Sequence, residues 1–216
     1  MIYEAIVIGA TFAAAGIAHR YKEKCLVVER RAQGGYEFFT SQLFCEKPLS
    51  VYPYFSECDS AFCTEIISVT QKNDGFICLT CGVEGFQSFE GKRIVDTRCS
   101  AEMSASKTYD LLIESKHAPS FENLSCEKTS GENRYLLRCP VPLACDFAEA
   151  REIAQAIVES FSEEQRLILS ADEFNYRIKE GYPKMQDGVL LLPSKAYQNP
   201  SLAFEAGFLT FAEDEK

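Results

Sequence analysis

The chain has 216 residues and a formal net charge of −10, and 46% of its residues are hydrophobic. This length suits one large domain, or one domain with a small second lobe. The acidic balance argues against nucleic acid and against an anionic membrane surface as partners, because both require a basic face. No apolar run reaches the roughly 18 residues of a membrane-spanning helix, and the N-terminus lacks the pattern of a signal peptide. We therefore expect a cytoplasmic protein that acts on a small molecule.

The clearest pattern lies in the first thirty residues. A strand over Tyr3–Ile8 runs into a turn at Gly9, a helix follows through Ala13–Ala18, and a second strand covers Cys25–Val28. Glu29 closes that strand, about twenty residues after the first glycine, which is the place of the ribose-binding acid in dinucleotide-binding folds. The spacing predicts a βαβ unit of that kind.

The glycine turn departs from the usual fingerprint. The fingerprint is Gly-x-Gly-x-x-Gly/Ala, and this chain reads Gly9-Ala10-Thr11-Phe12-Ala13-Ala14. The second glycine normally lets the backbone approach a pyrophosphate at the helix N-terminus. Thr11 replaces it, and a β-branched side chain there is stiff. Further along, Gly34-Gly35 marks a second turn.

The middle of the chain changes to a β pattern. Strands over Thr64–Gln71, Phe76–Cys81 and Phe86–Gly91 are joined by glycine-containing turns, which predicts a three-stranded meander. A short apolar strand, Arg93–Thr97, follows and is expected to return to the main sheet.

A second lobe is expected from Tyr109. It contains a strand at Asp110–Glu114, a hairpin around Gly131, a helix at Phe147–Phe161 and a strand at Gln165–Leu169. The helix has apolar residues at helical spacing. Asp146 is its predicted N-cap, and Glu149 is placed for a reciprocal capping-box contact.

The C-terminal part returns to the first domain. Val189–Leu192 is an apolar run suited to a buried parallel strand. Asn199-Pro200 then starts a last helix over Ser201–Phe211.

This order of features resembles the FAD-binding fold of the glutathione-reductase-like flavoproteins, and in particular the FAD-dependent oxidoreductases. The resemblance implies an α/β, Rossmann-like FAD/NAD(P)-binding fold with a central parallel sheet, a β-meander and a small α+β second lobe. It also implies that residues 1–108 and 185–216 form the dinucleotide-binding domain and that residues 109–184 form the second lobe.

The resemblance also implies where FAD binds. The family's Asp-Ala-Thr-Gly turn reads Asp96-Thr97-Arg98-Cys99 here, and its Gly-Asp pair reads Pro193-Ser194. Ser194 is expected nearer the ribityl chain, and Arg30 is a candidate for a phosphate contact. The resemblance identifies no catalytic residue. The residues expected around the adenosine end are Gly9, Thr11, Ala14, Glu29 and Gly35.

Two other functions stay open from the sequence. One is a non-catalytic descendant of the fold, kept as a binding module or subunit, and its motivation is the joint change at Thr11, Cys99 and Pro193-Ser194. The other is a binder of NAD(P) or an ADP-type nucleotide that uses only the first βαβ unit. A homo-oligomer or a partner subunit is compatible with each of these functions.

We assign structural roles to the cysteines and surface positions to the histidines. The chain has 10 cysteines and 2 histidines, and without a secretion signal the thiols are expected to be reduced. Cys78-x-x-Cys81 has no second ligand pair, and strand positions three apart face opposite sides, so no metal site is expected. His19 and His117 are predicted at the surface.

Overall fold

The computed structural model describes residues 1–38, 49–122, 124–197 and 199–212, with the side chains of residues 172 and 173 left out. The chain divides into two compact units. Unit 1 contains Met1–Tyr36, Leu49–Cys99 and the segment from Glu180, and the main segment of unit 2 is Ser100–Lys179. In the described part of the chain, no helix is long and apolar enough to cross a membrane.

Unit 1 is built on a six-stranded sheet in the order β13-β14-β8-β2-β3-β4. The five strands from β14 to β4 are parallel, and β13 pairs with β14 in the antiparallel sense. Every residue of β2 and β3 is buried, as expected for central parallel strands that are covered on both faces. The bounds are β2 (Ala5–Ile8), β3 (Cys25–Val28), β4 (Asp59–Ala61), β8 (Ile94–Asp96), β13 (Lys184–Gln186) and β14 (Val189–Leu191).

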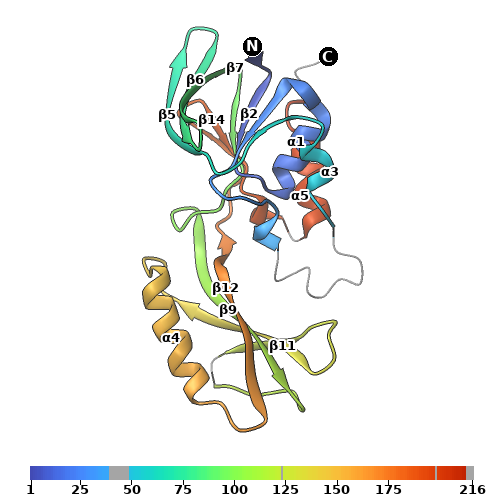
Figure 1. The fold of residues 1–216 in the computed structure, drawn as a ribbon, viewed down its shortest axis with the longest axis vertical. Helices are drawn as coiled ribbons and strands as arrows, with labels where there is room; N and C mark the ends of the chain where they lie inside the picture. The colour runs from blue at the N-terminus through green and yellow to red at the C-terminus, as the bar shows by residue number, and fades with distance from the viewer. Residues whose placement is uncertain (39–48, 123, 198, 213–216) are drawn as a thin grey trace. The chain divides into compact units, whose positions relative to one another are not determined.

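The predicted meander covers one face of this sheet. Strands β5 (Glu65–Lys72), β6 (Gly75–Gly82) and β7 (Gly85–Gly91) pair in sequence, and β1 (Ile2–Tyr3) adds to β7. The meander lies on the opposite side of the sheet from the helices (Figure 1). The core between the two sheets is formed by alternate residues of the parallel strands with side chains of β6, namely Ile6, Ile8, Leu26, Val28, Ile94, Phe76 and Cys78.

Helices cover the other face. They are α1 (Phe12–Tyr21), α3 (Tyr52–Phe55) and α5 (Pro200–Leu209), and they lie together in Figure 1. A Cβ atom on Gly16 of α1 would fall on the carbonyl oxygen of Phe204, and one on Gly207 of α5 would fall on that of Ala13. The backbones of α1 and α5 therefore touch where two glycines leave room. Three short 3₁₀ turns complete the helical segments, η1 (Lys22–Lys24), η2 (Tyr36–Phe38) and η3 (Ser194–Ala196).

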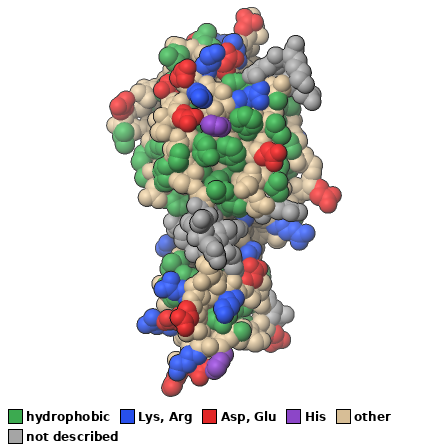
Figure 2. Space-filling model, turned by 90° about the vertical axis from the view of Figure 1, so that its right-hand side faces the viewer, with side chains coloured by type: hydrophobic (Ala, Val, Ile, Leu, Met, Phe, Trp, Pro, Cys, Tyr) green, Lys and Arg blue, Asp and Glu red, His purple; other side chains and the backbone are tan. Residues whose placement is uncertain are grey.

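The outer side of these helices is partly apolar. Hydrophobic side chains gather on this face around a histidine (Figure 2). The ring of His19 lies 5.2 Å from that of Tyr54 and 5.9 Å from that of Phe208, and its Nδ1 is 3.1 Å from Oε2 of Glu57. His19 is thus a surface residue packed in an aromatic cluster, as the sequence predicts.

The described part of unit 2 is an antiparallel sheet with α4 against it. The strand order is β10-β11-β9-β12, and α4 (Phe147–Glu159) packs Ala150 and Ala154 onto Tyr109, Leu111 and Leu137. Asp146 caps α4, and Glu149 completes the predicted capping box. The strand bounds are β9 (Ser104–Ser115), β10 (Ser125–Lys128), β11 (Arg134–Val141) and β12 (Gln165–Ile178).

Three predicted elements differ from the structure. The strand predicted at Gln165–Leu169 continues to Ile178, because β12 pairs with β9 through three register shifts. The strand predicted from Asp110 begins at Ser104, since the same pairing extends it. The strand predicted as buried over Val189–Leu192, β14, is half-buried. For Phe38–Phe44 the sequence allows a short helix or a covering loop, and this segment lies almost entirely outside the described residues.

The contact between α1 and α5 predicts a stability effect opposite to helix propensity. Propensity alone makes Gly→Ala in a helix stabilising by about 1 kcal/mol. We expect Gly207→Ala to lower the free energy of unfolding by about 1–3 kcal/mol instead, because the new methyl group overlaps the Ala13 carbonyl. Urea denaturation checks this. Glu205→Ala, an exposed site on the same helix, is the matched control and should shift stability by about 0.5 kcal/mol or less.

Candidate functional site

The turn between β2 and α1 is fixed by Gly9. Its φ is +93°, in the region that glycine occupies without strain. Its N–H donates to the carbonyl of Val28 over 2.8 Å. A Cβ on Gly9 would lie 2.6 Å from Cγ of Arg98, so both the dihedral angle and the space require glycine here.

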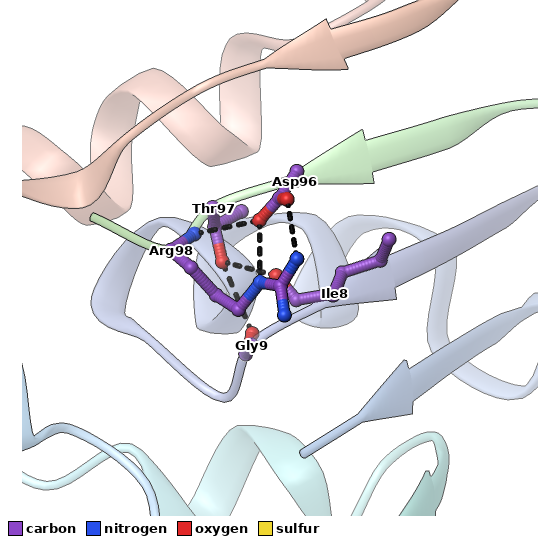
Figure 3. Close-up of polar contacts among 5 residues, drawn as sticks. All are labelled: Ile8, Gly9, Asp96, Thr97 and Arg98. Carbon is purple, nitrogen blue, oxygen red and sulfur yellow. Dashed lines mark hydrogen bonds and ion pairs between the residues drawn. The ribbon is translucent and has the colours of Figure 1, made fainter. Parts of the chain in front are cut away.

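Thr97 joins the end of β8 to this turn. Its hydroxyl donates to the carbonyl oxygens of Ile8 and Gly9, each over 3.0 Å, and its N–H donates to the same Ile8 oxygen. Thr97 is completely buried. Figure 3 shows these contacts. The carboxyl ends of β2 and β8 are therefore held together by one side chain.

Arg98 lies across Gly9 and pairs with Asp96. Its Nε and Nη2 donate to the two Asp96 carboxylate oxygens over 3.0 and 2.8 Å, and its backbone N–H donates to Oδ1 (Figure 3). These hydrogen bonds raise the pKa of Arg98. The arrangement places a bidentate ion pair directly beside the turn.

Glu29 is buried at the end of β3 and faces the same turn. Its Oε2 accepts from the N–H of Ala10 over 2.8 Å, and its Oε1 accepts from the N–H of Arg31 over 2.9 Å. A carboxylate has about four acceptor positions. Each oxygen therefore keeps capacity for a further donor after these two bonds.

Two hydroxyl groups occupy the start of α1. Thr11 is the N-cap, and its Oγ1 accepts from the N–H of Ala14 over 3.2 Å. The N–H of Ala13 donates to Oγ of Ser194 over 3.3 Å. Ser194 is fully buried, and its own N–H donates to the carbonyl of Thr97. The structure therefore places Ser194 at the N-terminus of this helix, and a contact of Ser194 with a ribityl chain stays a prediction.

The remaining predicted residues lie around this group. Gly35 has a φ of +80° and donates its N–H to the Ala10 carbonyl over 2.7 Å. Ala14 is fully buried under the turn. Arg30 is exposed and lines a small pocket beside Gly9 and Glu29. All seven predicted site residues therefore belong to one edge of the unit 1 sheet.

The pocket is small for a ligand site. Its cavity volume is about 10 Å³ between the ends of β2 and β3 and the start of β5, which is about the space of one water molecule and far below the roughly 300–1,000 Å³ of typical small-molecule sites. Sequence reasoning did not assign Arg98, Thr64 and Glu65 to its wall. Thr64 and Glu65 come from the meander, and no local signal in the sequence indicates that contact.

These contacts suit one part of a dinucleotide better than another. Glu29 fits a ribose, because its buried carboxylate keeps acceptor capacity beside an open pocket. Arg30 supplies positive charge at the same place, whereas the guanidinium of Arg98 is already paired with Asp96. At the pyrophosphate position, however, Thr11 and Ser194 already bind two of the helix N–H groups. A phosphate reaches those N–H groups only if the hydroxyls turn away.

Comparison by sequence gives no relative, since no family model and no curated protein match this chain. Comparison by structure finds many solved proteins of similar fold. The anhydrotetracycline hydroxylase OxyS from Streptomyces rimosus superposes with a TM-score of 0.62 at 12% identity, covering 100% of this chain and 63% of OxyS. Aklavinone-11 hydroxylase, solved with FAD and aklavinone, has a TM-score of 0.58 at 11% identity, covering 95% and 61%.

A third structure is a geranylgeranyl bacteriochlorophyll reductase-like protein from Thermoplasma acidophilum, with a TM-score of 0.62 at 10% identity and coverage of 99% and 79%. This chain spans 63% of CabE, an aromatic hydroxylase from angucycline biosynthesis, and 60% of BexE. Identities this low show the fold alone. The chain has the α/β, Rossmann-like fold of these hydroxylases, one of which was solved with FAD.

Proposed function

We propose that this protein is an FAD-dependent oxidoreductase-like protein that acts on a small molecule in the cytoplasm. The observation that carries the proposal is Glu29, a buried carboxylate at the carboxyl end of a parallel strand, hydrogen-bonded to the glycine turn. In open α/β sheets ligands bind at this edge. The likeness to a hydroxylase solved with FAD supports FAD as the dinucleotide.

The adenosine end would be held by this chain's own groups. Glu29 would accept from the ribose hydroxyls, and the N-terminus of α1 would face the phosphates with its positive dipole end. Arg30 would add positive charge beside them. FAD supplies the hydride-transfer chemistry, and the protein binds and orients it.

The direct test is whether the protein carries flavin. We expect purified protein to be yellow and to release FAD on denaturation, or to take up FAD in an equilibrium titration. Colourless protein that gains no flavin when refolded with excess FAD would refute the proposal. It would instead support a binding module or subunit that has lost the cofactor.

Replacing Glu29 tests the ribose contact. We expect Glu29→Gln to weaken FAD binding by about 10- to 100-fold, because hydrogen bonds to a charged acceptor contribute about 1.5–3 kcal/mol. Titration calorimetry measures the affinity, and a melting curve shows that the variant is folded. Glu65→Gln removes an exposed carboxylate from the same pocket wall and should leave affinity within about twofold. Equal losses in both variants would count against a ribose-binding role.

Replacing Thr11 tests the closed phosphate position. Thr11→Gly removes the hydroxyl that binds the Ala14 N–H, while glycine at an N-cap costs only a few tenths of a kcal/mol. We expect FAD and ADP to bind about tenfold more tightly, since a charged acceptor gains a free donor. Thr11→Ser keeps the capping hydroxyl and removes only the methyl group. A gain with serine would assign the obstacle to side-chain bulk instead of the hydrogen bond.

A further inference from the structure

Two cysteines lie side by side at the amino ends of neighbouring strands. Cys25 is the first residue of β3, and Cys58 directly precedes β4. The two strands are parallel, and Leu26 pairs with Asp59. The register therefore brings Cys25 next to Cys58 across the sheet.

The two thiols are in contact and differ in exposure. Cys25 is fully buried, whereas Cys58 is half-buried. A side-chain hydrogen bond joins Cys25 and Cys58, and the Cys58 thiol donates to the carbonyl oxygen of Phe55 over 3.7 Å. A reagent from solvent thus meets Cys58 first, with Cys25 directly behind it.

Their contact gives the two thiols different pKa values. The hydrogen bond with Cys25 lowers the pKa of Cys58, although burial and the nearby carboxylates of Asp59 and Glu57 act in the opposite direction. The same bond and burial raise the pKa of Cys25. The thiolate is the reactive form of cysteine, so Cys58 is the nucleophile of the pair.

Other buried cysteines lack these properties. Burial raises the pKa of Cys78 to about 11 and that of Cys139 to about 12, which keeps these thiols protonated and inert. Cys63 is exposed and follows β4 closely, which makes it a matched comparison for reactivity that depends on exposure alone.

We propose that Cys58 and Cys25 form a thiol pair that a hydroperoxide oxidises to an intramolecular disulfide. The Cys58 thiolate attacks the outer peroxide oxygen, the O–O bond breaks, and the alkoxide or hydroxide leaves and takes a proton. Cys58 becomes a sulfenic acid. The Cys25 sulfur then attacks the Cys58 sulfur, the S–S bond forms, the S–O bond breaks, and water leaves with the Cys25 proton. Two thiols lose two electrons, and one peroxide gains them.

The disulfide would close a covalent loop that contains part of the candidate site. The segment from Cys25 to Cys58 contains Glu29 and Gly35, so oxidation would tether the strand that carries the ribose-binding acid to its neighbour β4. A crosslink across such a loop reduces the freedom of the unfolded chain. We expect the melting temperature to rise by several degrees on oxidation and to return on reduction. The pair does not depend on whether FAD binds.

The experiment uses the reduced full-length protein. After brief exposure to hydrogen peroxide and alkylation of the remaining thiols, peptide mass spectrometry should find Cys25 linked to Cys58. Cys63→Ser should keep this link, and Cys58→Ser should abolish it. In Cys25→Ala, which leaves a small apolar residue in the buried site, a sulfenic-acid probe should label Cys58 several-fold more than in the wild type.

Two results would overturn the proposal. One is wild-type Cys58 oxidised to sulfinic acid, or left reduced, without a link to Cys25. The other is Cys58 linked mainly to Cys63, which would show that exposure and not the pairing of β3 with β4 directs the oxidation. If Cys25→Ala fails to fold, the linkage in the wild type and in Cys63→Ser still decides between these outcomes.

Discussion

The turn at Gly9 is the constraint on which the rest of unit 1 depends. Within three residues β2 ends and α1 begins, and the ends of β3 and β8 are hydrogen-bonded to Gly9 at the start of this turn. The positive φ lets the chain reverse, and the missing side chain lets Arg98 cross over it. Because backbone groups are satisfied mutually here, the carboxyl edge of the sheet is one connected arrangement, and Glu29 and Ser194 are positioned as parts of it.

Most of the elements could be predicted because their signals are local. The bounds of β3 follow from a short apolar run, those of α4 from a capping box and helical periodicity, and the meander from glycine turns between alternating strands. The full length of β12 could not be predicted. Its polar second half is a strand only because β9, more than fifty residues earlier in the chain, supplies the pairing partner.

The candidate site also combines residues that local patterns predict with residues that only distant contacts bring in. Spacing from Gly9 was sufficient to find Glu29, since the βαβ unit fixes that distance in the sequence. Nothing local to Ser194 indicates that its hydroxyl meets the N–H of Ala13, because the two residues are 181 positions apart. The sequence shows Arg98 only as one residue of an altered family motif, Asp96-Thr97-Arg98-Cys99. Its path over Gly9 depends on the pairing of β8 with β2, which a single sequence does not display.

The close contact of α1 with α5 has a consequence for how the chain is made. The sheet and helix of unit 2 come from one continuous segment, Ser104–Ile178, whereas β14 and α5 of unit 1 follow it. During synthesis, the face of α1 that carries Gly16 and the edge of β8 lack their partners until α5 and β14 emerge. Unit 2 can complete its core first. α1 and α5 are far apart in the sequence, so bringing them together costs loop-closure entropy. Unit 1 is therefore the slower-folding part, and the apolar face of α1 stays exposed until α5 packs on it.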